Sequence, residues 1–327
     1  MSIIVTARRA ALAAVLAGPL LPLAARAQGP TPDRPVRIVV PFPPGGPVDT
    51  LGRLIAERLA ARWGRPVIVE NRPGGSGGVV GTQHVARSAP DGTTLGMVIS
   101  AHTINPAIQR DLPYDTLRDL APVTLIARAQ VVLVAHPDFP ARSLEEVIEL
   151  SRRSPDGIPT ASPGVGTLMN MTGHLLAAQA GARLSDVPYQ GSAPALTDVL
   201  AGRVPLMLDI WHSVRAHVEA GRLRVIAAAG PTPIQGAEHI PLMSATVPGF
   251  AVVSPMGLVA PGATPSAIRE RIADDIRAAL QEQETRARMQ ALGLEAVGST
   301  PAEYGAFIES EIARWQAVVR DRGIRVQ

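Results

Sequence analysis

The sequence contains no cysteine, few aromatic residues and no long uninterrupted apolar segment in its mature part. The absence of cysteine excludes disulfide bonds, thiolate nucleophiles and cysteine-ligated metals. Aromatic residues make up only 3% of the chain, so valine, leucine, isoleucine and alanine must fill most of the core. The most apolar later stretch, residues 123–135, contains Arg128 and Gln130, which argues against a membrane-spanning helix there.

The length and composition favour a globular protein. The chain has 327 residues, of which 46% are apolar and 18% are charged. Such a chain can bury a substantial core, and its length suits two domains of ordinary size. A disordered protein is excluded by this balance of apolar and charged residues.

The first 27 residues have the pattern of an export signal. Arg8 and Arg9 precede an apolar stretch at residues 10–23, and Ala-Arg-Ala at residues 25–27 is typical of a cleavage site. The apolar stretch is too short to span a bilayer. We therefore expect an exported, periplasmic protein whose signal peptide is cleaved near Ala27. The paired arginines leave ordinary secretion and twin-arginine export as alternatives.

The mature chain is close to electrically neutral. Three of the 31 arginines lie in the first 27 residues, which contain no acidic residue, so 28 arginines and 28 acidic residues remain. Every basic side chain is arginine, because lysine is absent. A net charge near zero gives no support for nucleic-acid binding or for a polybasic membrane patch.

Strand-like and helix-like segments alternate along the chain, which is typical of parallel βαβ units. We predict strands at residues 36–42, 66–71, 93–100, 158–163, 222–230 and 252–261, with residues 121–137 passing between domains as one or two strands. We predict helices at residues 48–64, 81–89, 144–154, 167–181, 192–202, 213–221, 265–293 and 301–323. Ser143 and Glu146 predict a capping box at the start of one helix.

Two such groups of segments, with a return near the C-terminus, predict two α/β domains that face a cleft. The predicted division is a signal peptide at residues 1–27, a discontinuous first domain at 28–127 plus 251–327, and a second domain at 128–250. In open α/β sheets, ligands bind beyond the carboxyl ends of the strands, where loops lead into helices. Glycine and serine are concentrated in those loops of this chain.

The first of these loops is Pro-Phe-Pro-Pro-Gly-Gly at residues 41–46. A helix N-terminus has unpaired N–H groups and a partial positive charge, and it therefore attracts carboxylates. Gly45 and Gly46 allow a ligand to approach the backbone closely. Asp49 follows in the first turn, where it could hold a ligand amine, hydroxyl or water, or could simply complement the helix dipole. A tight turn with Pro47 as the first helical residue explains the same loop without any ligand.

A second glycine-rich loop, at residues 70–81, matches two enzyme patterns. Gly74 to Gly78 surround Ser76 in a G-x-S-x-G arrangement that is typical of serine hydrolases. That mechanism needs a late histidine, and only His239 is available, in a loop-like segment. A dinucleotide fingerprint needs an acidic residue at the end of the next strand, which ends instead at Ser100. We interpret the loop as a permissive turn against the cleft, with a secreted hydrolase using Ser76 as the alternative.

No pattern of metal ligands is present. The seven histidines show no H-E-x-x-H motif, and His212 and His217 are five residues apart, which is unsuitable for ligation from one helix face. We therefore expect neither a metal nor a cofactor.

Loops in the second half repeat the design of the first loop. Residues 161–167 and 188–194 each follow a strand, contain small hydroxyl residues and glycine, and open a helix. Ser162, Thr167 and Ser192 could donate to carboxylate oxygens, although each also suits a helix N-cap. Asp209 ends another predicted strand, where the cleft should be.

Five segments together resemble the Bug-type solute-binding proteins of tripartite tricarboxylate transporters. These segments are residues 34–59, 67–95, 112–126, 187–204 and 298–319. The resemblance covers essentially the whole mature chain, in order. It implies a two-domain periplasmic binding protein of the type II class, with a ligand cleft between the domains. It also implies a non-catalytic monomer that captures a small organic carboxylate for a membrane permease.

The resemblance also implies which residues hold the ligand, partly through ordered waters. In the first domain they are Phe42, Pro43, Pro44, Asp49, His102 and Asn105. In the second domain they are Ser162, Gly164, Gly166, Thr167, Tyr189, Ser192, Ala193 and Asp209.

The chain departs from the family pattern at several positions. The family usually has alanine at Pro44, threonine at Val48 and an aromatic pair near Pro255 and Met256, which implies a different cleft rim and an altered selectivity. Residues 227–244 also lack the usual basic stretch. Which carboxylate is bound, and whether the protein serves transport or presents its ligand to a receptor as a sensor, stay open at this point.

Overall fold

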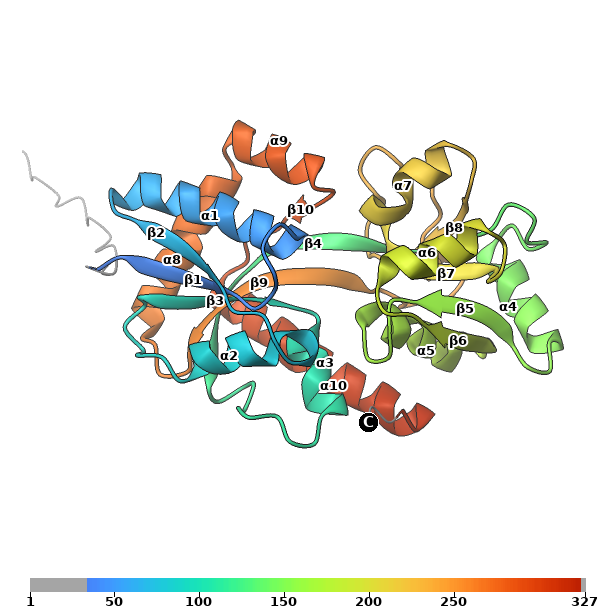
Figure 1. Cartoon of the computed structure of the whole chain (residues 1–327), viewed down its shortest axis with the longest axis horizontal. Coiled ribbons are helices and arrows are strands. Elements are labelled where there is room, and N and C mark those ends of the chain that lie inside the picture. The colour runs from blue at the N-terminus through green and yellow to red at the C-terminus, as the bar shows by residue number, and fades with distance from the viewer. Residues whose placement is uncertain (1–33, 325–327) are drawn as a thin grey trace, which may run out of the picture.

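The computed structural model describes residues 34–324, without the side chain of Ser76. The predicted signal peptide at residues 1–27 lies outside the described residues. Strands and helices alternate through the described chain, close to the segments expected from the sequence. Figure 1 shows two lobes side by side, joined by two long strands near the centre.

The strands of the described residues form one extended sheet. They are β1 (Val36–Val40), β2 (Val67–Asn71), β3 (Thr94–Ile99), β4 (Leu120–Ala135), β5 (Ile158–Ser162), β6 (Leu184–Pro188), β7 (Leu206–Ile210), β8 (Arg224–Ala228), β9 (Val253–Pro261) and β10 (Glu295–Ala296). Their order is β2-β1-β3-β9-β4-β7-β5-β6, with β8 and β10 also pairing with β4. In each lobe the strands that precede helices are parallel: β1 with β2 and β3, and β5 with β6 and β7.

Strand β4 belongs to both lobes. Its residues up to Gln130 pair with β9 in the first lobe, and its residues from Val131 onward pair with β7 and β8 in the second. The chain thus enters the second lobe through β4 and returns through β9. The sequence predicted one or two strands at residues 121–137, and the structure has a single strand there. The exact division into domains at residues 127/128 and 250/251 stays a prediction.

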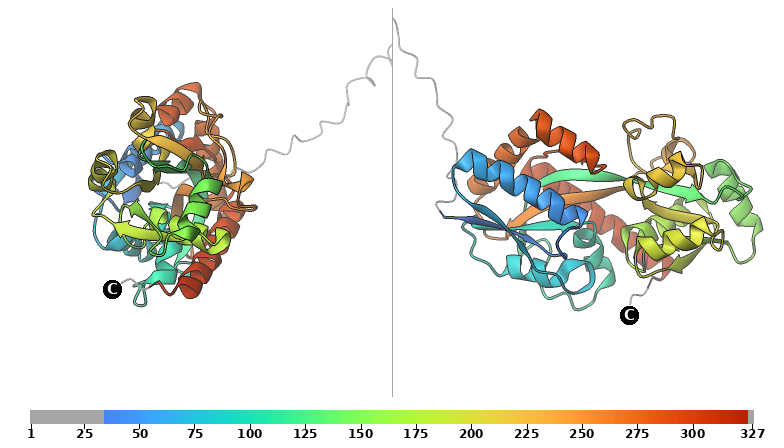
Figure 2. Two further views of the ribbon diagram at one scale, coloured as in Figure 1. Left: turned by 90° about the vertical axis from the view of Figure 1, so that its right-hand side faces the viewer. Right: turned by 45° about the horizontal axis from the view of Figure 1, so that its top comes forward.

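Helices cover both faces of the sheet in each lobe (Figure 2). They are α1 (Pro47–Trp63), α2 (Val79–Ala86), α3 (Ala101–Ile108), α4 (Leu144–Arg153), α5 (Leu168–Ala180), α6 (Ser192–Leu200), α7 (Trp211–Glu219), α8 (Ser266–Leu280), α9 (Gln283–Ala291) and α10 (Pro301–Arg322), with short 3-10 turns η1 (Ser76–Gly78) and η2 (Met243–Ala245). In the first lobe, α1, α8 and α9 pack on one face and α2 and α10 on the other. In the second lobe, α4 and α5 pack on one face and α6 and α7 on the other.

The helix predicted at residues 265–293 is wrong, because the chain forms two helices there. Helix α8 ends at Leu280 and α9 starts at Gln283, with Glu282 in an extended conformation between them. Ile276 and Met289 both reach the same core under α1. A single straight helix would not direct both side chains into that core, and no glycine or proline marks the break.

Two further local features differ from the expectations. Helix α3 was not predicted, and it contains Pro106 in its interior. The capping box at α4 is incomplete: the Ser143 hydroxyl accepts the Glu146 N–H, but the Glu146 carboxylate accepts the N–H of Arg142 instead of that of Ser143. The two halves of the cap therefore satisfy neighbouring backbone groups.

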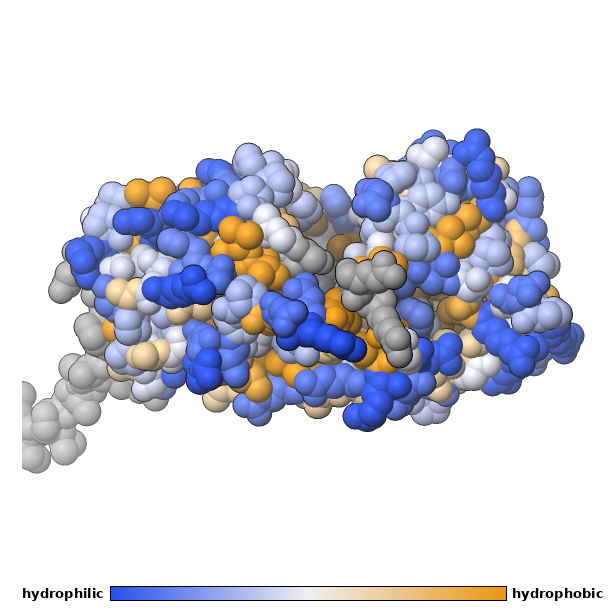
Figure 3. Space-filling model, turned by 60° about the horizontal axis from the view of Figure 1, so that its bottom comes forward, coloured by the Kyte–Doolittle hydropathy of each residue, from blue (hydrophilic) through white to orange (hydrophobic). Residues whose placement is uncertain are grey.

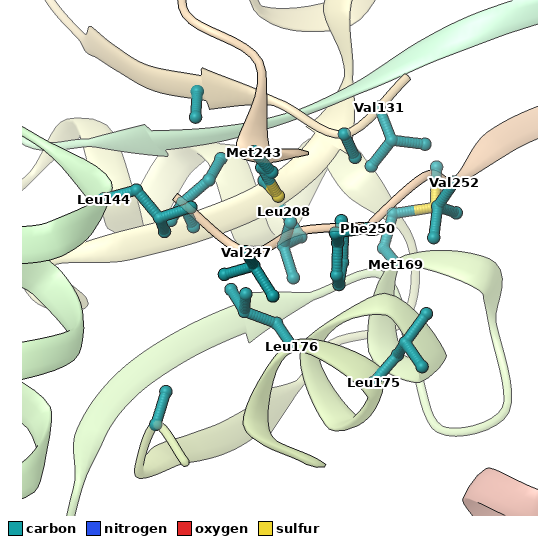
Figure 4. Packing of buried hydrophobic residues seen from close by; sticks show 14 of the residues in the cluster. Val131, Leu144, Met169, Leu175, Leu176, Leu208, Met243, Val247, Phe250 and Val252 are labelled. Atoms are coloured by element: carbon teal, nitrogen blue, oxygen red, sulfur yellow. The ribbon is translucent and has the colours of Figure 1, made fainter. Parts of the chain in front are cut away.

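The core of the second lobe includes residues from the far end of the chain. Met243, Val247 and Phe250, which precede β9, lie against Leu176 of α5 and Leu208 of β7 (Figure 4). Trp315 and Val318 of α10 and Ile104 of α3 belong to the same buried cluster. Because α3 and the start of α10 belong to the first lobe, this cluster ties the two lobes together along one side. Apolar surface that is buried in such a cluster stabilises the folded state by about 25 cal/mol per Å² removed from water.

Candidate functional site

The strand-to-helix loops of the two lobes face each other. The carboxyl ends of β1 and β5 point toward the gap between the lobes in Figure 1. Figure 3 shows that the molecular surface is hollowed between the lobes. The loops β1–α1, β5–α5 and β6–α6 contain seven of the predicted ligand residues: Phe42, Pro43, Pro44, Gly164, Gly166, Thr167 and Tyr189. Ser162 ends β5 and Ser192 begins α6, so both flank these loops. Parallel strands that end at a shared opening are the usual setting for ligands in α/β proteins.

Asp49 organises the β1–α1 loop. One carboxylate oxygen accepts the N–H of Gly45 at 2.9 Å and the Nε–H of Arg53 at 2.9 Å. The other accepts the side-chain amide of Asn71 at 2.8 Å, and the same amide donates to the carbonyl of Phe42 at 3.1 Å. Asp49 is only 3% exposed. Both of its oxygens are thus engaged by the loop, by α1 and by β2. Pro43 and Pro44 are exposed at the surface.

The environment of Asp49 keeps its carboxylate ionised. Burial alone would raise the pKa, but the hydrogen bonds from Arg53, Gly45 and Asn71 outweigh it and lower the pKa from 3.8 to about 2. The loop therefore retains its central anion throughout the pH range in which proteins are usually handled.

The second lobe repeats this arrangement with an amide. Asn170 occupies the third position of α5, as Asp49 does in α1, and its side-chain oxygen accepts the N–H of Gly166 at 3.0 Å, four residues earlier. Gly45 and Gly166 both adopt a positive φ, which favours glycine. Thr167 caps α5, and its hydroxyl also donates to the carbonyl of Gly164 at 2.7 Å. Each lobe thus presents a glycine loop braced by the third residue of the following helix.

We expect Asn170→Ala to loosen the β5–α5 loop. The Gly166 N–H loses its acceptor, and an unsatisfied backbone donor costs about 1–3 kcal/mol. Asn170→Asp keeps an acceptor oxygen at the same place and should retain most of the stability. Thermal unfolding of the two variants checks this expectation, and equal loss in both would contradict it.

Asp209 and the β6–α6 loop form the other polar part of the site. Ser192 donates from its hydroxyl to one oxygen of Asp209 at 3.2 Å, and the N–H of Ile210 donates to the same oxygen at 2.7 Å. Tyr189 donates its hydroxyl to Asp198 at 2.8 Å, so this hydroxyl is already used within the lobe. Ala193 is exposed in the first turn of α6.

The second oxygen of Asp209 is buried and has no hydrogen-bond partner among the described residues. Asp209 is 1% exposed. Burial raises its pKa from 3.8 to about 6, against the lowering effect of the bonds from Ile210 and Ser192. The side chain therefore changes its charge near neutral pH.

Ser162 lines a small cavity that is partly open to solvent. The cavity has a volume of about 10 Å³ and is lined by Ser162, Asn170, His174 and Leu208, among others. The Ser162 hydroxyl has no partner among the described residues. A water molecule needs roughly 10–15 Å³ of such space, so this cavity is just large enough for one water beside the hydroxyl.

His102 and Asn105 lie on α3, behind the glycine-rich loop. A Cβ at Gly77 would come within 2.5 Å of the Cβ of Ala101, so the loop packs directly on this helix. Burial lowers the pKa of His102 to about 4, which keeps the ring neutral at neutral pH. Asn105 is buried and hydrogen-bonds the hydroxyl of Tyr114. Both predicted residues therefore lie beneath the loop surface.

Two supporting residues were missed by sequence reasoning. Asn71 and Asn170 brace the two glycine loops but carry no motif of their own. A shared spacing would have identified Asn170, because Gly45–Asp49 and Gly166–Asn170 both place a polar side chain four residues after a glycine. Pro255 and Met256 are buried within β9, and their effect on selectivity stays a prediction.

Residues 34–324 contain neither a metal-binding cluster nor a membrane-spanning helix. In this part of the chain no group of three or more acidic or histidine side chains is placed to hold a metal ion. None of the helices in this range has both the length and the apolar character required to cross a bilayer.

Comparisons with known proteins give a consistent result. A family model described as the tripartite tricarboxylate transporter family receptor matches residues 51–324. Protein BugT of Bordetella pertussis is 32% identical over 299 residues, which cover 90% of this chain and 91% of that protein. The structure of R. palustris Rpa4515 with adipate has 32% identity and a TM-score of 0.75, covering 90% of this chain and 99% of that one. MatC of Rhodopseudomonas palustris with bound malate has 31% identity and a TM-score of 0.71, covering 88% and 99%.

Proposed function

The chain belongs to the tripartite tricarboxylate transporter receptor family, and from this premise we propose that its cleft captures a small organic carboxylate. The match over residues 51–324 carries this proposal. The family, the two-domain periplasmic-binding-protein fold and the role as a ligand-binding receptor of a transporter, all predicted from the sequence, are confirmed. Two structural neighbours are described with adipate and malate, which supports a carboxylate as the ligand here.

In this proposal the ligand is held by backbone N–H groups and small hydroxyls rather than by arginine side chains. The first turns of α1, α5 and α6 have N–H groups without partners inside the helix, and such groups attract carboxylates. The first arginine after the β1–α1 loop, Arg53 of α1, is already paired with Asp49. Binding by two lobes implies that they close around the solute.

We assign Asp49 and Asn170 to positioning rather than to direct contact. Each accepts an N–H of its own loop, at Gly45 and Gly166. Phe42, Pro43, Pro44, Gly164 and Ser192 remain proposed contacts, with Ser162 acting through an ordered water.

We further propose that the protein performs no catalysis. The family and its structural neighbours are binding proteins. The rival, a hydrolase using Ser76, needs His239 as its base, and His239 lies exposed between Ala237 and Ile240, which pack on the second lobe. Ser76 lies in η1 of the first lobe. The receptor is supported if Ser76→Ala binds the carboxylate as wild type does and neither protein hydrolyses an ester. The rival is supported if wild type hydrolyses the ester and Ser76→Ala does not.

The cellular setting follows from the same premise. Periplasmic binding proteins act in the periplasm, and we propose export with cleavage near Ala27. The proposed partner is a membrane permease, and the proposed state is a monomer. A sensor that presents its bound ligand to a receptor is the alternative that the site shares with transport.

A thermal-shift screen against a panel of carboxylates tests the proposed ligand class. Adipate, malate, citrate, an amino acid and an aromatic acid form a sufficient panel. A ligand at a thousandfold excess over its Kd adds about 4 kcal/mol to the free energy of unfolding, which raises the melting temperature measurably. A panel without any stabilising acid, on protein purified free of bound ligand, would contradict the proposal.

A further inference from the structure

A second pocket lies between the lobes, and none of its lining residues is among the proposed ligand contacts. It has a volume of about 330 Å³, which is within the range of small-molecule sites. Its walls come from β4, from the start of α7, from the loop at residues 232–235 and from the end of α9 with β10. We call it the hinge pocket, because β4 is the strand that passes from one lobe to the other.

Both lobes form the hinge pocket and touch at its edge. Gly293 follows α9 in the first lobe and adopts a φ of +67°. A Cβ at Gly293 would lie 2.7 Å from the Cβ of His212, which is in α7 of the second lobe. A change in the angle between the lobes must therefore change the shape of this pocket.

The pocket has an excess of positive charge. Two arginines and one acidic residue line it: Arg128, Arg215 and Glu295. Arg128 forms a two-point ion pair with Glu295, at 2.5 and 2.8 Å, so that charge is balanced. Arg215 pairs with Glu219 one turn later, where both side chains are more than half exposed. Such an exposed pair is weak, so Arg215 can exchange Glu219 for an anion in the pocket.

The remaining lining is mixed, because Thr232, Gln235 and Gln290 are polar and the other part is apolar. Trp211, Ile234 and Leu294 line the pocket and are each less than 10% exposed. Gln130 also lines it, is 7% exposed, and has a side-chain oxygen without a hydrogen-bond partner among the described residues. The Gln130 oxygen lies against Gly230, so it is not a contact for the acid. A pocket with apolar side chains in its wall and one exchangeable cation suits an amphipathic acid.

We propose that the hinge pocket is a second ligand site, which binds a small carboxylic acid with a flat apolar body. The carboxylate lies at Arg215 and the apolar body lies against Trp211 and Leu294. Because the pocket takes its walls from both lobes, an occupant favours the lobe angle that fits it best. The site is thus placed to modulate capture in the main cleft, and by linkage the effect is reciprocal.

Benzoate is a suitable probe, because it is a flat acid of the proposed kind. We expect calorimetry on the mature protein to give a Kd of about 1 mM or tighter. Arg215→Ala should weaken binding about tenfold or more, since it removes a charge-assisted hydrogen bond. Trp211 is one of three tryptophans, and the other two, Trp63 and Trp315, are not among the pocket residues. Benzoate should therefore change tryptophan emission in wild type but not in Trp211→Phe.

Two matched variants separate this site from the main cleft. Arg153→Ala removes another exposed arginine with an i,i+4 glutamate partner, on α4, and should leave benzoate binding unchanged. Ser192→Ala alters the main cleft and should also leave it unchanged. Loss of benzoate binding in Ser192→Ala with retention in Arg215→Ala would place benzoate in the main cleft and overturn the hinge site. If no benzoate binding is detected at all, the proposal of a ligand site in the hinge pocket is also wrong. The proposed function of the main cleft is not affected by that result, because the carboxylate screen tests it separately.

Discussion

Asp49→Ala is expected to weaken carboxylate binding by about 100-fold or more while the protein still folds. The substitution removes the acceptor for the Gly45 N–H, the Asn71 amide and Arg53. The β1–α1 loop then has to be ordered during binding. Fixing the backbone of two residues costs roughly 2–3 kcal/mol, which corresponds to about 100-fold in affinity.

The same variant should also lower the free energy of unfolding, by on the order of 3 kcal/mol, because buried donors lose their acceptor. Asp49→Asn is the informative control, since Asn170 braces the matching loop of the second lobe with an amide oxygen. We expect Asp49→Asn to recover part of the stability and of the affinity. Calorimetry with the strongest acid from the panel, and thermal unfolding, measure both. Wild-type affinity in Asp49→Ala would refute the positioning role.

Carboxylate affinity is expected to rise as the pH falls through about 6. Asp209 has a pKa of about 6 because it is buried, and its charged form repels a bound anion. If only the protonated form accepts the ligand, affinity falls about thirtyfold between pH 5 and pH 7.5. Calorimetry across this range measures the slope. Asp209→Asn should bind equally well at both ends of the range.

Asp138→Asn serves as the matched control, because Asp138 has a side chain that is 92% exposed. This variant should keep the wild-type pH profile. A flat profile in wild type, or an unchanged slope in Asp209→Asn, would remove Asp209 from the site electrostatics. The raised pKa of Asp209 also makes the stability of the fold depend on pH. The folded state holds the proton more tightly than the unfolded chain does, so this contribution to the free energy of unfolding is full below pH 4 and is lost as the pH rises through 6. Its size is on the order of 3 kcal/mol.

The order of the elements followed from the sequence because their signals are local. Hydrophobic periodicity located α1, with Leu51, Leu54, Ile55 and Leu59 on its buried face. The division of residues 265–293 into α8 and α9 did not follow, because it depends on where Met289 meets the core under α1. Such a break is set by packing across the fold and leaves no mark in local composition.

The site was predicted less completely than the fold. Small residues after strands located the three loops, since that rule depends only on topology. The direction of each side chain depends on its neighbours, which the sequence does not show. Asp49 was expected to face a ligand, but its oxygens are engaged by Gly45, Arg53 and Asn71. Ser162 ends β5 as expected, yet its hydroxyl is buried without a partner among the described residues, beside a small cavity.

The position of Trp315 has a consequence for the order in which the protein is assembled. Trp315 and Val318 of α10 complete a core otherwise built largely from residues in the middle of the chain. During vectorial synthesis the strands of the second lobe are made well before α10. The core of that lobe is therefore complete only when nearly the last residues of the polypeptide have been synthesised. An excised fragment of residues 128–250 would leave bare the apolar surface that α10 covers, and it is expected to aggregate rather than to behave as an autonomous folding unit.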